Sequence, residues 1–177
     1  MKISNTLFVI LFICLLGCDD ESELPVPEFK ANITSTAGSW EPNSGTLIFF
    51  EKDGIGVVQL KLGYSKNRKI QKQIHLGIAD KNFPTDTPRS FSLVELSNDF
   101  SFFAEYFLND NGQSDQNTWK ASALHKNSLN LKINEVYNEN GSTYASGEFG
   151  FVACQSNSIP GCITFKGAFV NIKCGNQ

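Results

Sequence analysis

Along most of the chain after residue 28, apolar and polar residues alternate one by one. In the segment 29–33 the first, third and fifth residues are apolar, and the segments 74–78 and 129–133 repeat this pattern. A period of two places side chains on alternate faces of a β-strand, whereas an amphipathic helix needs a period near 3.6. No interior segment sustains a helical period, so the pattern predicts an all-β protein.

Further segments of this kind lie at 46–51, 57–62, 90–96, 100–108, 144–154 and 162–173, with a short run around Trp119. The dipeptides Asp53-Gly54 and Asn140-Gly141 predict tight turns between strands. About ten short strands at this spacing predict one antiparallel β-sandwich or open barrel over residues 29–177. A segment of this length can form one full core, to which many of the 15 phenylalanines would contribute.

Residues 1–17 have the pattern of an export signal. Lys2 precedes an apolar stretch from Leu7 to Leu16 that is too short to span a bilayer, and Gly17 follows it. Cys18 directly after this small residue resembles the cleavage site of a bacterial lipoprotein signal. The resemblance implies cleavage before Cys18, diacylation of its sulfur and acylation of the new amine, for example with palmitate. Three acyl chains anchor a protein stably in a membrane.

Residues 18–28 read as a short acidic, proline-containing tether between lipid and domain. Five of the 18 acidic residues lie in it, and without these and Lys2 the chain keeps 13 acidic against 14 of its 15 basic residues. The acidity therefore belongs to the tether. An acidic run beside the lipidated cysteine resembles the signal that sends Bacteroidetes lipoproteins to the outer face of the outer membrane. In enteric bacteria Asp19 would instead indicate inner-membrane retention, so a periplasm-facing location stays open.

The cysteines of the exported domain are Cys154, Cys162 and Cys174, and export permits disulfides. Placing Cys154 opposite Cys162 puts Phe151 across from Phe165, with both cysteines on the face opposite these rings. Hydrophobic pattern and cysteine register agree, so a Cys154–Cys162 disulfide is predicted. Cys174 is either a free thiol or an alternative partner of Cys162.

The last third of the chain carries a family resemblance. The segment 129–135, the sequence Ser146-Gly-Glu-Phe-Gly-Phe151 and the sequence Ile163-Thr-Phe-Lys-Gly-Ala-Phe169 resemble the ending of small Bacteroidetes outer-membrane lipoproteins. The opening, 29–33 followed by Trp40, resembles theirs as well. Phe165-Lys166 departs from the polar pair that usually precedes the glycine. Those families are domains of unknown function, so the resemblance implies a fold and a location, and no catalytic residue.

Few residues suggest chemistry. His75 and His125 are isolated, no catalytic, nucleotide or metal motif stands out, and we expect neither a cofactor nor a metal. A near-neutral exported domain is a poor candidate for nucleic acid. Trp40 and Trp119 are candidates for stacking on a ligand. We therefore expect a non-catalytic, membrane-anchored binding or accessory module of an envelope complex, with a glycan-binding accessory, or a hydrolase or an inhibitor of one, as alternatives.

Overall fold

The computed structural model describes residues 25–81, 88–93, 100–109, 118–121, 123–155 and 161–176. The expected signal (1–17), Cys18 and most of the tether lie outside these residues. The described chain is all-β apart from one 3-10 helix, η2 (Ala123–Ser128), as the alternating pattern predicts. Among the described residues, no helix is long and apolar enough to cross a bilayer.

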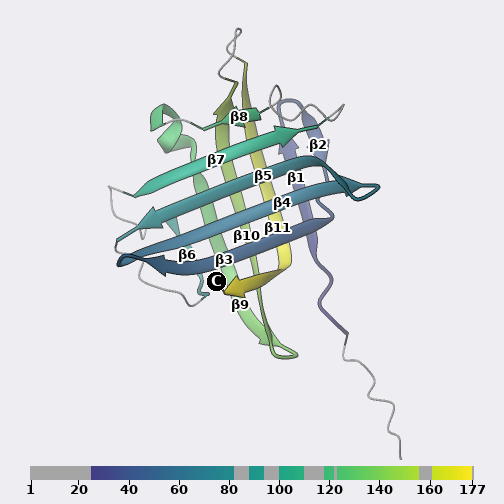
Figure 1. The fold of residues 1–177 in the computed structure, drawn as a ribbon, viewed down its shortest axis with the longest axis vertical. Coiled ribbons are helices and arrows are strands. Elements are labelled where there is room, and N and C mark those ends of the chain that lie inside the picture. The colour runs from purple at the N-terminus through teal and green to yellow at the C-terminus, as the bar shows by residue number, and fades with distance from the viewer. Residues whose placement is uncertain are drawn as a thin grey trace, which may run out of the picture.

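Two layers of strands face each other across the core (Figure 1). In the view of Figure 1 the front layer runs across the picture and the back layer runs roughly upright, so the layers cross steeply. The front layer consists of β3 (Ser44–Lys52), β4 (Ile55–Lys66), β5 (Lys69–Asp80), β7 (Ser101–Leu108) and β8 (Thr118–Lys120). The back layer consists of β2 (Gly38–Trp40), β1 (Lys30–Ser35), β11 (Cys162–Asn176), β10 (Ser142–Cys154), β9 (Asn130–Glu139) and β6 (Phe91–Ser92).

The layers join at two corners, so that strand pairing closes into a ring. At one corner the end of β11 pairs with β3 over Cys174–Leu47, Gly175–Ile48 and Asn176–Phe49, and this pairing is parallel. At the other corner β8 meets β10 through the pair Lys120–Cys154. The expected fold class is confirmed, with one difference: the sheet is mixed. Because β11 is long enough to pass beyond β1, its end reaches β3 in the same direction.

Large apolar side chains fill the space between the layers. The most completely buried include Phe49, Phe151, Phe165 and Phe169, and Tyr106 stacks on Phe165 with ring centroids 4.8 Å apart. The alternation predicted for 129–133 is observed, since the apolar residues are buried and the residues between them are exposed. Fully burying one such side chain contributes about 2 kcal/mol. The alternation therefore fixes which face of each strand remains free to meet a ligand.

The two predicted turns have the expected backbone. Asp53 and Gly54 have φ of 56° and 75°, and Asn140 and Gly141 have φ of 51° and 71°. Positive φ at both central residues matches a type I′ turn, which suits the twist of the flanking strands. These turns set the β3–β4 register and the β9–β10 register as far as Ser146, beyond which a bulge shifts the pairing.

Candidate functional site

A groove of about 400 Å³ crosses the outer face of the back layer. Its floor contains Gly150 of β10 and Ala168 of β11, whose neighbours Phe149, Phe151 and Phe169 point inward to the core. Small outward residues between large inward ones lower the surface at this point. The surrounding polar residues are Asn32, Thr34, Ser128, Asn130, Glu148, Thr164 and Lys166.

Strand register brings these residues together from four strands. One cross-strand row is Asn32–Ala168–Glu148, and the next is Thr34–Lys166–Gly150–Asn130. Directly opposed residues on one face have Cβ atoms about 5 Å apart. Each row therefore places a small residue beside polar side chains of the adjoining strands.

Several of these side chains have unused hydrogen-bonding capacity. The Thr34 hydroxyl donates to the Lys166 carbonyl at 3.3 Å, which leaves its oxygen free to accept. Among the described residues, no hydrogen bond or ion pair involves the side-chain amides of Asn32 and Asn130 or the charged ends of Glu148 and Lys166. The groove therefore offers donors, acceptors and one charge of each sign to a ligand.

A second groove, of about 630 Å³, adjoins the first because Asn32 and Thr34 line both. It lies where β2 and the end of β4 meet and is also lined by Trp40 and Tyr64. Both aromatic side chains are half-buried. The buried Nε1 of Trp40 has no acceptor among the described residues. Of the two tryptophans that the sequence suggests, Trp40 thus lines this groove.

Trp119 occupies a different environment. Its ring packs against Tyr106 at a centroid distance of 5.4 Å, and, like Trp40, it packs against the core. It lines neither of the two grooves described above. The structure therefore does not bring Trp40 and Trp119 together as one stacking platform.

His75 lies on the outer face of the front layer, in a cross-strand row between Lys61 and Glu105. Phe103 meets its ring edge to face at 4.6 Å, and the buried Nε2 has no partner among the described residues. Burial and, next, the Lys61 ammonium hold the pKa of His75 below its ordinary value, although the Glu105 carboxylate opposes them.

The Glu105 carboxylate itself pairs with Lys120 at 3.4 Å. His75 lines neither groove, and the side chain of His125 lies outside the described residues. Among the described residues, no group of three or more His, Cys, Asp or Glu side chains could hold a metal ion.

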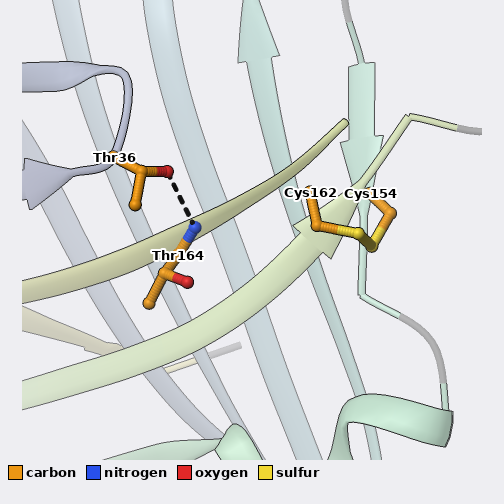
Figure 2. The surroundings of a disulfide bond; sticks show 4 residues. All are labelled: Thr36, Cys154, Cys162 and Thr164. Carbon is orange, nitrogen blue, oxygen red and sulfur yellow. Dashed lines mark hydrogen bonds between the residues drawn. A yellow bond between two sulfur atoms is a disulfide. The ribbon is translucent and has the colours of Figure 1, made fainter. Parts of the chain in front are cut away.

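The predicted Cys154–Cys162 disulfide is present, with Cα atoms 4.0 Å apart (Figure 2). The Gln155 N–H donates to the Gly161 carbonyl at 3.3 Å, so the neighbouring cysteine pair occupies a close, non-hydrogen-bonded position. Beside it, the Thr164 N–H donates to the Thr36 hydroxyl at 3.4 Å, which fastens the β1–β2 turn to β11 (Figure 2).

Cys174 is a free, half-buried thiol rather than a partner of Cys162. Burial raises the pKa of Cys174 to about 11.

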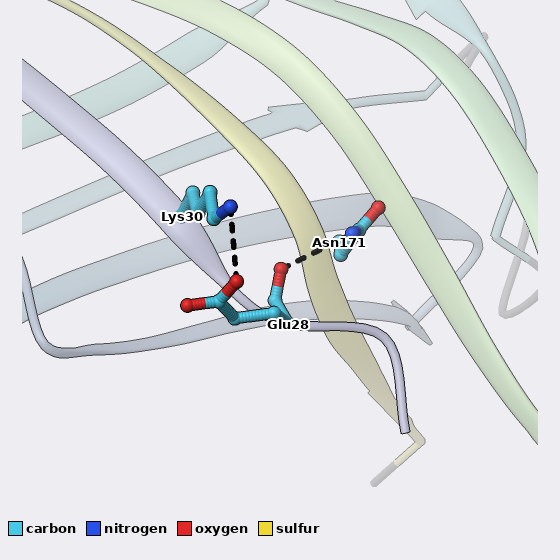
Figure 3. Close-up of polar contacts among 3 residues, drawn as sticks. All are labelled: Glu28, Lys30 and Asn171. Carbon is cyan, nitrogen blue, oxygen red and sulfur yellow. Dashed lines mark hydrogen bonds and ion pairs between the residues drawn. The ribbon is translucent and has the colours of Figure 1, made fainter. Parts of the chain in front are cut away.

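Residues 25–29, here called the N-terminal strap, lie along the domain. Asn171, in a left-handed conformation (φ 56°) where β11 bulges against β10, donates from Nδ2 to the Glu28 carbonyl at 3.1 Å (Figure 3). The Glu28 carboxylate pairs with Lys30 at 2.9 Å (Figure 3). Asn140 donates to the Pro25 carbonyl at 3.5 Å. The strap therefore leaves the domain beside the β9–β10 turn.

Sequence reasoning did not identify the polar groove. The signal that could have found it is the cysteine register, because opposing Cys154 to Cys162 also opposes Gly150 to Lys166 and Glu148 to Ala168. Small outward residues beside polar ones on adjoining strands mark a depression.

Comparison with known proteins adds no relative. No protein-family model matches the chain, and no curated protein or solved structure matches it either.

Proposed function

We propose that this chain is a lipid-anchored, non-catalytic binding protein of a bacterial envelope, and that it serves as a binding or accessory module of an envelope complex. Its anchor would be Cys18, directly after the export signal (1–17) that resembles those of bacterial lipoproteins. Its location would be the outer membrane with the domain facing the exterior, and the periplasm-facing orientation is the alternative.

The observation that carries the binding proposal is the outer groove. Four strands contribute polar side chains around the floor that contains Gly150 and Ala168. The backbone groups between β1, β11, β10 and β9 are paired with one another, so side chains supply the polar groups on this face. A depression with convergent polar side chains on a rigid sheet is the expected form of a recognition site.

The binding proposal is tested by photocrosslinking in intact cells. A photoreactive phenylalanine analogue at the position of Lys132, which is exposed and pairs with Glu148 at the edge of the groove, should yield a reproducible adduct with one envelope component. The same analogue at the position of Thr46, which is exposed on the front layer, should not yield it. Equal adducts from both positions, or none from either, would contradict the groove as the contact surface.

The anchor is tested separately with the Cys18→Ala variant. Metabolic labelling with a radioactive fatty acid should mark the natural chain and not this variant, which should also leave the membrane fraction. Protease added to intact cells should digest the natural chain if it faces the exterior, and protection in cells with an intact outer membrane would favour the periplasmic alternative.

A further inference from the structure

We infer that the outer groove binds a neutral oligosaccharide whose chain continues over β1 into the adjoining groove at Trp40 and Tyr64. The inference rests on the proposed function, because it assigns a ligand class to the same groove. Asn32 and Thr34 line both grooves, and Trp40 pairs with the inward-facing Ile33, so the ligand would pass round the edge of β1 to reach it.

The polar side chains match the hydroxyl groups of a sugar. An amide such as that of Asn32 or Asn130 both donates and accepts hydrogen bonds, and so does the hydroxyl of Thr164. Neighbouring hydroxyls of a sugar also both donate and accept, so they complement these groups. The two amides have no side-chain hydrogen-bond partner among the described residues. Binding a sugar would therefore disrupt no described side-chain hydrogen bond of either amide.

The charge balance favours a neutral ligand. Glu148 and Lys166 are the ionised side chains that line the outer groove, and their charges cancel. A polyanion such as nucleic acid or a phosphorylated polymer is bound by clustered cations, which this groove does not supply.

An extended peptide fits less well. Such peptides commonly add a strand to an exposed sheet edge and place alternate side chains in pockets. The floor of the outer groove is the face of paired strands, because β11 has β1 on one side and β10 on the other. At the far side of β1, the residues Ile33, Thr34 and Ser35 are already paired with β2, which leaves only the three residues 30–32 of that edge for strand addition.

The adjoining groove supplies an aromatic end. Trp40 and Tyr64 offer rings against which the apolar C–H face of a sugar can stack. The Trp40 Nε1 is buried, so a sugar would contact the exposed part of the half-buried ring and not this nitrogen. Hydroxyl recognition along one groove and stacking at its end together point to an oligosaccharide several units long.

The test measures binding of purified full-length lipoprotein in detergent to neutral oligosaccharides of glucose, mannose, xylose and N-acetylglucosamine. Ala168→Phe, which fills the groove from an exposed strand position, should weaken binding of the retained sugar at least 10-fold. The matched Thr46→Phe, also at an exposed strand position but on the front layer, should leave it unchanged.

Asn130→Ala, which removes an amide without adding bulk, should also weaken binding, and thermal melting identifies any variant that fails to fold. Absence of binding to every neutral oligosaccharide would overturn the inference, as would equal affinities of natural chain and Ala168→Phe. If the crosslinker at position 132 then captures an envelope protein, the proposed function stands and the ligand class is wrong. If it captures nothing, both fail.

Discussion

Removal of the Cys154–Cys162 disulfide should destabilise the domain by an amount that can be worked from its position. The bond joins residues 8 apart in sequence. In the chain-entropy treatment, closing a loop of this length lowers the entropy of the unfolded chain by about 8 cal/mol/K, which stabilises the fold by about 2.5 kcal/mol at 25 °C. The hydrogen bond from Gln155 to Gly161 and the pairing along β10 and β11 remain, so the double variant should still fold.

Urea unfolding of the Cys154→Ser/Cys162→Ser double variant, followed by tryptophan fluorescence, measures this loss. At a slope of about 2 kcal/mol/M, the midpoint should fall by about 1 M. Reduction of the natural chain should give the same shift and should not affect the double variant. The Cys174→Ser variant is the control, because Cys174 is not in a disulfide. A midpoint unchanged in the double variant, or lowered equally in the control, would refute the reasoning.

Three further perturbations test the packing and the titrating groups. Gly147→Ala should destabilise the fold by about 3 kcal/mol in the same assay, because its Cβ would lie 2.3 Å from the Lys132 carbonyl oxygen. Gly150→Ala, whose added Cβ would have its nearest contact at 3.3 Å, should change stability far less. Similar losses of stability in the two variants would contradict this reasoning. Alkylation of Cys174 at pH 8 should be about 100-fold slower in the folded chain than in urea, since its pKa rises from 9.0 to about 11, and equal rates would contradict burial. Because folding lowers the pKa of His75, the unfolded chain binds more protons than the folded chain below pH 6.5, and stability falls as the pH drops from 7 to 5. His75→Gln should reduce that fall, measured as the change in urea midpoint. An identical fall in the variant and the natural chain would disprove the role of His75.

The sequence predicted most of the fold because burial on one face of a strand requires alternation, and this chain alternates clearly. It also predicted the cysteine pair, since the register that joins Cys154 to Cys162 is the one that buries Phe151 and Phe165 together. It did not predict the parallel contact between β11 and β3. That contact depends on how far the end of β11 passes beyond β1, which no local pattern encodes.

The groove was missed for a related reason. Asn32, Asn130 and Lys166 are ordinary exposed residues of separate strands, and tertiary pairing makes them neighbours. The second strand of the first hairpin, β2, was not predicted either, because three residues are too few to show a period. Because β2 was not predicted, the sequence placed Trp40 in no strand.

The docked strap changes how far the domain could stand from a bilayer. If Cys18 carries the lipid, the seven residues 18–24 link the anchor to the strap, and they span at most roughly 25 Å. A linker that was free up to residue 28 would span at most roughly 40 Å. Asn140, which contacts Pro25, sits at one end of β10, and the disulfide sits at the other. The turn at Asn140 would thus lie at the end of β10 nearest the anchor, and the disulfide at the end away from it.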